Sequence, residues 1–315
     1  MKKTAQAFAP AAISSFFEIH DDEENKPIID LERVGARGGG FGLQKGVLTQ
    51  VTVEEVKSPG ITVIINGTRA PEAKTTKKVI ETLLSTQRKS YVVIVNHTIE
   101  VPIGTGFGTS AGGALTAGLA FKEALDLPLT YNQIGKIAHV AEIQCRTGLG
   151  TVSSLTSIGG CVLVVEPGAP GICQIDRIPI TSDYMVVAGF IESKTPNKTV
   201  LANAEKRQMV NRYGREALAA IFAEPSLENF LDCCWNFSEK AGFATDNIRQ
   251  LVKLAKKAGA VGAAQNMIGE AMHALVLKEN VKEVAEAFKQ VLPSEKVIVS
   301  KIDFQGARLI GHEKI

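Results

Sequence analysis

A glycine-rich segment between a strand pattern and a helix pattern constrains the fold of this chain most. Residues 91–101 are rich in β-branched side chains, as in a strand, and residues 114–125 are small and apolar on nearly every face, as in a buried helix. Between them, residues 102–113 read Pro-Ile-Gly-Thr-Gly-Phe-Gly-Thr-Ser-Ala-Gly-Gly. Glycines let successive backbone N–H groups converge on an anion, and a helix N-terminus adds partial positive charge. The segment therefore predicts a binding loop for phosphate groups.

Three other interpretations of this segment need to be weighed. A Walker A loop ends in Gly-Lys-Ser/Thr, and no lysine stands at that position here. The spacing of Gly104, Gly106 and Gly108 approaches a dinucleotide-binding fingerprint, but Asp126 directly follows the helix and not a second strand, so the βαβ context is missing. A glycine-rich turn needed only for tight packing of a helix on a sheet stays open as the structural alternative.

The rest of the chain alternates strand and helix patterns. In the first half, we expect strands over residues 4–9, 47–53, 61–65 and 161–165, and helices over 71–84 and from Thr130, which forms a capping box with Gln133, to about 145. In the second half, we expect strands over 185–191, 260–277 in two pieces and 296–304, and helices over about 199–222, 226–240, 246–258 and 280–290. Prolines and glycines at 167–171 favour a boundary near residue 180, dividing the chain into domains 1–180 and 181–315. This order predicts an α+β protein.

Two further segments look irregular. Residues 37–42 read Arg-Gly-Gly-Gly-Phe-Gly, which favours a sharp turn or a close approach of the backbone to a ligand. Residues 20–24 read His-Asp-Asp-Glu-Glu, which favours a charged surface loop after the first strand.

Residues 102–111 resemble the phosphate-binding motif of the GHMP kinases, the superfamily of galactokinase, homoserine kinase, mevalonate kinase and phosphomevalonate kinase. Phe8-Ala9-Pro10 stands where the first, substrate-side motif of that superfamily begins, and residues 259–267 resemble its third motif, which closes over the nucleotide phosphates. The resemblance implies an N-terminal domain like the second domain of ribosomal protein S5, a ferredoxin-like C-terminal domain and an active cleft between them. It implies that ATP phosphates are bound by Pro102, Gly104, Thr105, Gly106, Phe107, Gly108, Thr109, Ser110 and Ala111.

Within the superfamily, residues 35–40, 146–152 and 167–171 resemble segments of the archaeal pantoate kinases. Those kinases resemble Pro-Gly-His-Ile-Thr-Gly-Phe-Phe in the first motif, whereas residues 10–17 of this chain place Ala12 and Ser14 at the positions of the His and the Thr. Because polar groups in a site normally answer polar groups of the substrate, this departure favours a related branch, the mevalonate 3-phosphate 5-kinases of the Thermoplasma-type mevalonate pathway, which serves isoprenoid synthesis. We expect phosphorylation of the primary hydroxyl of a short branched hydroxy acid: mevalonate 3-phosphate first, with pantoate, in coenzyme A synthesis, as the alternative.

The resemblance also implies the catalytic groups. Ser110 would offer its hydroxyl to Mg²⁺, and the carboxylate of Glu142 would complete the metal site, since Mg²⁺ prefers oxygen ligands. Many relatives carry a catalytic Asp in a Ser-Gly-x-Asp segment, and the matching residues 147–151 hold no carboxylate, as in homoserine kinase. The substrate hydroxyl would then lose its proton late or to the phosphate itself, as a loose transition state permits. A sensor without catalytic activity on the same fold is the second alternative.

The expected substrate-binding residues are Ser14 and Ser15 of the first motif, His20, Arg37 and Arg146. Arg37 is the first candidate to hold a carboxylate or phosphate with its planar fork of donors, and Arg146 and Lys194 are further candidates for that task. His20, with Asp21 and Asp22, could alternatively supply a base, although a charge run is more often a solvated surface.

Composition limits the partners. Lys and Arg total 35 against 33 Asp and Glu, which gives no electrostatic footprint for nucleic acid or an anionic membrane. Five cysteines without a C-x-x-C pair favour reduced thiols and a cytoplasmic location. Two early lysines before a short apolar stretch fit a first strand better than a signal peptide, and no run of about 18 apolar residues predicts a membrane span. We expect ATP and Mg²⁺ as cofactors, a small hydroxy acid as substrate and, from the superfamily, a possible homodimer.

Overall fold

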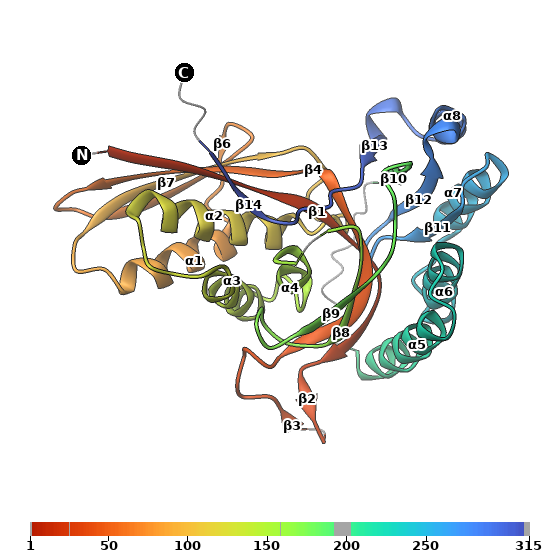
Figure 1. Ribbon diagram of the computed structural model, residues 1–315, viewed down its shortest axis with the longest axis horizontal. Helices are drawn as coiled ribbons and strands as arrows, with labels where there is room; N and C mark the ends of the chain where they lie inside the picture. The colour runs from red at the N-terminus through yellow and green to blue at the C-terminus, as the bar shows by residue number, and fades with distance from the viewer. Residues whose placement is uncertain (1, 25, 158, 192–202, 312–315) are drawn as a thin grey trace.

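The computed structural model describes residues 2–24, 26–157, 159–191 and 203–311, which form two β-sheets with helices packed against each (Figure 1). The first sheet has the strand order β14 (Arg308–Ile310), β1 (Lys2–His20), β4 (Gly35–Glu55), β7 (Tyr91–Ile99), β5 (Gly60–Ile65) and β6 (Thr68–Arg69). A branch of the same sheet consists of β8 (Cys161–Glu166), which pairs with β4, and β9 (Gln174–Ile178), which pairs with β8. A small separate hairpin joins β2 (Asp22–Glu23) and β3 (Lys26–Pro27).

The long antiparallel pair of β1 and β4 connects the two halves of the molecule. Their register runs from Lys2 opposite Glu54 to His20 opposite Gly35, with irregularities at Pro10/Ala11 and Ser14/Phe16. The first strand is thus far longer than the expected residues 4–9. The expected turn at residues 37–42 is wrong, because this segment lies inside β4. A Cβ at Gly40 would overlap the carbonyl oxygen of Ile13, so the glycines allow close approach of β1, not of a ligand.

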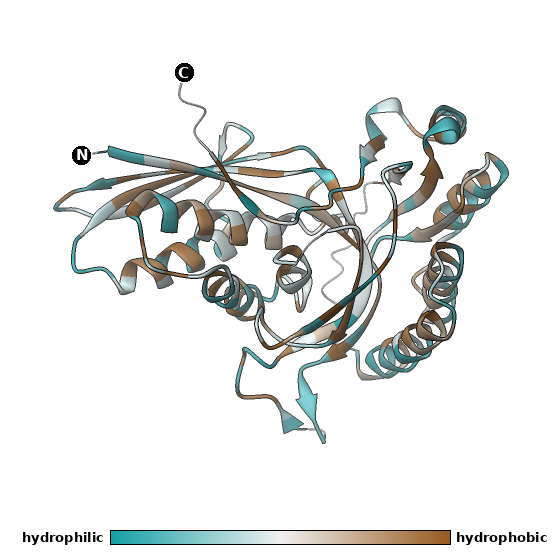
Figure 2. Cartoon of the chain, viewed as in Figure 1, coloured by the Kyte–Doolittle hydropathy of each residue, from teal (hydrophilic) through white to brown (hydrophobic). Residues whose placement is uncertain are grey.

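Four helices cover one face of the first sheet: α1 (Lys74–Ser85), α2 (Thr109–Leu125), α3 (Tyr131–Cys145) and α4 (Thr151–Leu155) (Figure 1). Small apolar residues of α2 pack on β1 and β4, as expected of a buried helix, and Figure 2 shows hydrophobic residues along these helices and strands. The capping box that opens α3 is confirmed, since Thr130 Oγ1 accepts from Gln133 N at 3.3 Å and Gln133 Oε1 accepts from Thr130 N at 2.8 Å.

The second sheet is antiparallel, with the order β11 (Gly262–Gln265), β12 (Ala271–Leu277), β10 (Tyr184–Phe190) and β13 (Val297–Lys301). Its helices are α5 (Ala204–Ala223), α6 (Leu227–Lys240), α7 (Asp246–Lys257) and α8 (Val281–Lys289). The helix–sheet pairing of the two halves confirms the α+β class. None of the helices in the described ranges is long and apolar enough to cross a membrane.

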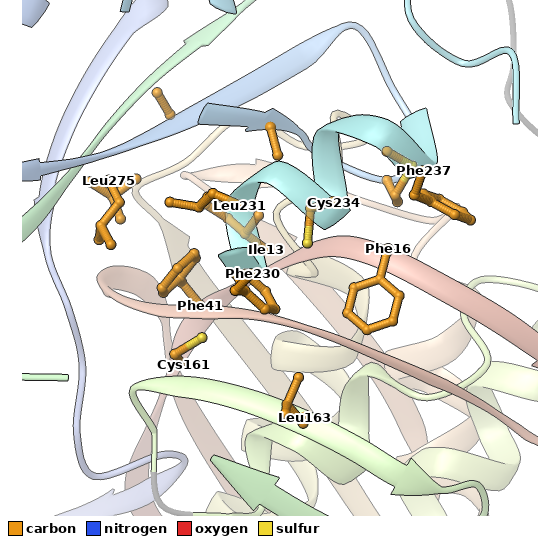
Figure 3. Packing of buried hydrophobic residues seen from close by; sticks show 14 of the residues in the cluster. Ile13, Phe16, Phe41, Cys161, Leu163, Phe230, Leu231, Cys234, Phe237 and Leu275 are labelled. Carbon is orange, nitrogen blue, oxygen red and sulfur yellow. The ribbon is translucent and has the colours of Figure 1, made fainter. Parts of the chain in front are cut away.

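An aromatic cluster fills the space between the two halves. The ring of Phe230 on α6 lies 5.5 Å from that of Phe41 on β4 and 6.2 Å from that of Phe16 on β1, both nearly edge-on (Figure 3). All three side chains are fully buried, so this contact is a core and not a loose interface. The chain enters the second sheet between β9 and β10, near the expected division at residue 180, and β14 then returns to pair with β1.

Candidate active site

The glycine-rich loop connects the end of β7 to the start of α2. Gly104, Gly106 and Gly108 have φ angles of +81°, +88° and +63°, in the left-handed region that favours glycine. Gly108 is the N-cap residue of α2, and no side chain caps this helix end. The first N–H groups of α2 therefore lack a side-chain acceptor, as a site for an anion requires.

Two distant segments hold this loop. Phe107 O accepts a hydrogen bond of 3.0 Å from Ala12 N on β1, and a Cβ at Gly108 would contact the carbonyl oxygen of Ala12 at 2.9 Å. On the other side, a Cβ at Gly106 would come within 2.9 Å of Asn266 Cβ, next to β11. Met267 N in turn donates to Ser14 O at 2.7 Å. The three segments that resemble superfamily motifs thus meet in space.

The two predicted metal ligands share one network of hydroxyl groups. Ser110, in the first turn of α2, donates to Thr75 Oγ1 at 3.4 Å, and Thr75 Oγ1 lies 3.0 Å from Thr147 Oγ1. Thr147 Oγ1 donates to Glu142 Oε1 at 3.3 Å. The structure therefore brings Ser110 and Glu142 together where the glycine-rich loop meets α2.

Glu142 is a buried carboxylate that forms no ion pair with any described residue. Its residue is 2 % exposed, and burial raises its pKa to about 7 although hydrogen bonds from Ser110 and Thr147 lower it. In the described part of the chain, no cluster of three His, Cys, Asp or Glu side chains could hold a metal by itself. One carboxylate and one hydroxyl fit Mg²⁺, which keeps several waters and takes its other ligands from substrate phosphates.

The serines of the first motif differ in their surroundings. Ser15 is fully buried, and its Oγ lies 3.0 Å from His273 Nε2 on β12, so it faces the second sheet. Ser14 is half-buried beside the loop, and its carbonyl holds Met267. Of this pair, Ser14 is the more exposed.

Arg37 lies at the other end of β1, opposite Glu18. Its guanidinium donates to Val165 O at 2.9 Å, Glu166 Oε2 at 3.1 Å and Glu18 Oε2 at 3.4 Å. Protein groups therefore already occupy the planar fork that we expected to hold the substrate.

The other substrate candidates lie apart. His20 Nε2 is 3.9 Å from Glu23 Oε1 near the end of β1, and neighbouring Asp21 pairs with Arg207 of α5. Arg146 is exposed at the C-terminal end of α3, beside the Thr147 network, in a left-handed conformation. Lys194 lies outside the described residues. Arg146 is thus the predicted arginine nearest in sequence to the predicted metal ligands.

Sequence reasoning missed Thr75, Thr147, Asn266 and His273. Thr75 sits at the start of an ordinary amphipathic helix, and His273 is one polar residue in an apolar strand. Thr147 stands in the segment that lacks the Asp, and Asn266 stands in the third motif, so these two carried a usable signal.

Known proteins are similar to this chain in sequence and fold. The model of the GHMP kinases N terminal domain matches residues 74–156, which include the loop and both predicted metal ligands. A pantoate kinase of Thermococcus kodakarensis is 30 % identical over 290 residues, covering 91 % of each chain. The chain belongs to the GHMP kinases. A pantoate kinase of Methanocaldococcus jannaschii is 26 % identical, covering 90 % of this chain and 96 % of that protein. A solved structure described as a phosphotransferase related to the CoA biosynthesis pathway is 28 % identical, with a TM-score of 0.84 over 99 % of this chain and 100 % of that one.

Membership confirms the expected GHMP kinase fold and the enzyme class. This GHMP kinase is an ATP-dependent phosphotransferase that acts on a hydroxyl group of a small molecule. The alternative of a non-catalytic sensor is therefore set aside.

Proposed function

We propose that this kinase transfers the γ-phosphoryl group of ATP to the primary hydroxyl of pantoate. The observation that carries the proposal is similarity over nine-tenths of the chain to pantoate kinases, together with an intact phosphate loop. The comparisons support pantoate, our alternative substrate, better than mevalonate 3-phosphate, which the sequence favoured.

The chain's own groups suffice to position the reaction. Backbone N–H groups of residues 104–110 would hold the ATP phosphates at the uncapped start of α2. Ser110 and Glu142 would hold Mg²⁺, which supplies positive charge to the phosphates. The metal would also stabilise the ionised carboxylate of Glu142, which burial disfavours. In this arrangement Thr75 and Thr147 orient the two metal ligands.

The segment that carries the catalytic Asp in many relatives offers no base for the substrate hydroxyl here. Residues 147–151 carry hydroxyl groups and no carboxylate, and Thr151 lies against Gly108 in the loop. A loose transition state for phosphoryl transfer needs little help from a base. We infer that positioning and charge, not proton removal, supply most of the rate increase.

Mevalonate 3-phosphate is the second candidate, on one observation. Ala12 lies against Gly108, and the carbonyl of Ser14 holds Met267 beside the loop, so two of the positions where the first motif departs from pantoate kinases lie next to the phosphate loop. Losing a donor to pantoate's secondary hydroxyl would cost about tenfold to a hundredfold in specificity.

The deciding experiment compares kcat/KM for pantoate, mevalonate 3-phosphate, mevalonate and homoserine on one preparation. Pantoate should be used best, and a Ser110→Ala preparation should lose that activity, which excludes a contaminating kinase. If Ser14 contacts the acid, Ser14→Thr should change the ratio between pantoate and mevalonate 3-phosphate. A higher kcat/KM for mevalonate 3-phosphate than for pantoate would refute the pantoate assignment.

A further inference from the structure

Asn266 lies beneath the phosphate loop and is fully buried. Its backbone N–H donates to Ala271 O at 2.8 Å, and the next residue, Met267, is bonded to Ser14 of β1. A Cβ added at Gly106 would come within 2.9 Å of the Asn266 Cβ, so the loop lies directly against this residue. The side chain therefore sits where the loop, the first motif and the second sheet meet.

A buried histidine fixes the orientation of the Asn266 amide. His273 Nδ1 lies 2.8 Å from Asn266 Oδ1, and because an amide oxygen only accepts, Nδ1 carries the proton. His273 Nε2 then accepts from Ser15 Oγ at 3.0 Å. Burial lowers the pKa of His273 to about 3, so the ring stays neutral near pH 7 and the order of donors is kept.

This order leaves the amide nitrogen of Asn266 free. In the described residues, Asn266 Nδ2 and Gln265 Oε1 are the buried side-chain polar atoms without a hydrogen-bond partner. Leaving a buried donor unpaired is costly, so a partner is expected in the working state. Of these two residues, only Asn266 has an unpaired donor, because Gln265 Nε2 already donates hydrogen bonds to Phe243 O and Gly269 O.

We propose that Asn266 Nδ2 donates a hydrogen bond to a phosphate oxygen of bound ATP, with His273 and Ser15 as positioning residues. The inference rests on the proposed use of residues 104–110 for nucleotide phosphates. An anion is the fitting partner, because the site presents a donor next to the backbone N–H groups of the loop. The nitrogen is covered at present, so the bond forms when the loop rearranges around the phosphates, as its glycines allow.

The test measures binding of the ATP analogue AMP-PNP and of adenosine by calorimetry, without any acid substrate. Asn266→Asp keeps the shape and the acceptor for His273 but replaces the donor with an anionic oxygen. We expect it to weaken AMP-PNP by about tenfold or more and to leave adenosine unchanged. If Asn266→Asp does not fold, Asn266→Ala should show the same selective loss.

The positioning role is tested with two histidine variants. His273→Gln should weaken AMP-PNP relative to adenosine and raise the KM for ATP more than that for the acid. The control is His97→Gln, since His97 is also a buried histidine between hydroxyl groups, those of Thr49 and Thr76, but has no contact with Asn266 among its described hydrogen bonds. The control should leave the AMP-PNP to adenosine ratio unchanged.

Two results would overturn the inference: folded Asn266 variants that bind AMP-PNP like the native protein, or equal losses for AMP-PNP and adenosine. A failed pantoate assay would not affect it, because nucleotide binding is measured without the acid. Failure of the native protein to bind AMP-PNP would remove the ATP assignment and this inference with it.

Discussion

Two buried glutamates, Glu142 in the loop region and Glu18 at the far end of β1, differ in whether the chain itself supplies a cation to pair with the carboxylate. Glu18 accepts from Arg215 at 3.1 Å and from Arg37 at 3.4 Å, so its partners are part of the chain. The side-chain partners of Glu142 among the described residues are hydroxyl groups, and burial raises its pKa to about 7. Removing a buried carboxylate that is paired with arginines leaves those charges uncompensated and destabilises the fold, whereas a buried carboxylate left without a cation indicates a site for a ligand.

The largest expected effect is at the phosphate loop. Gly106→Val should abolish activity, at least about a thousandfold, because its side chain would press on Asn266 at a φ of +88° and block close approach to phosphate. The control is Gly67→Val, which has a φ of +82° and nothing within 4 Å, so it carries similar strain away from the site. Kinetics and thermal unfolding of both variants separate the effects, and an active Gly106→Val enzyme would contradict the loop assignment.

Glu142→Gln should lower kcat on the order of a hundredfold to a thousandfold and raise the Mg²⁺ concentration needed for half-maximal rate. Its stability should not fall, since the variant removes a buried charge that has no cation. The measurement is a Mg²⁺ titration of the rate beside thermal unfolding. An unchanged Mg²⁺ requirement would place the metal elsewhere.

The pH dependence of stability follows from the same group. The folded pKa of Glu142 is about 7 against an ordinary value of 4.5, so between these values the folded state binds more protons than the unfolded state. Without metal, stability should therefore fall as pH rises from about 4.5 to 7, by up to about 3 kcal/mol from this group. Urea unfolding at several pH values should show the fall in the native protein and a smaller one in Glu142→Gln. If stability falls equally with pH in the native protein and in Glu142→Gln, Glu142 is not the group responsible.

Glu18→Gln should act on stability and not on the metal. Removing one partner leaves Arg37 and Arg215 without their shared acceptor, and since Arg215 is largely exposed we expect a loss of about 1–3 kcal/mol. Urea unfolding measures this loss, and the Mg²⁺ requirement should stay native. A Mg²⁺ defect like that of Glu142→Gln would erase the distinction between the two regions.

Arg37→Lys gives the smallest expected effect. Lysine keeps the charge but loses the fork that reaches Glu18, Glu166 and Val165 O together, so stability should fall by about 1 kcal/mol or less. The KM for the acid should stay within about twofold if the arginine is occupied by the protein. A large rise in that KM would instead support the substrate role expected from the sequence.

Local patterns were sufficient for much of the fold. The capping box at Thr130 and the small apolar face of α2 are each encoded by neighbouring residues, so helix and strand types could be predicted. The glycines at 38–40 could not be interpreted in this way, because what they accommodate is a strand more than twenty residues earlier. The spacing of glycines alone does not reveal which backbone segment packs against them.

The sequence by itself determined the superfamily and predicted the phosphate loop, since the motif is contiguous, and the resemblance to that superfamily supplied the candidates Ser110 and Glu142. Only the tertiary structure decided which polar groups have partners. In the structure, Arg37 donates to Glu18 and Glu166, and Ser15 is hydrogen-bonded to His273. Among the described residues, Asn266 Nδ2, beneath Gly106, has no hydrogen-bond partner. The physical reason is that pairing depends on contacts between residues up to 258 positions apart in the chain, which no local pattern contains.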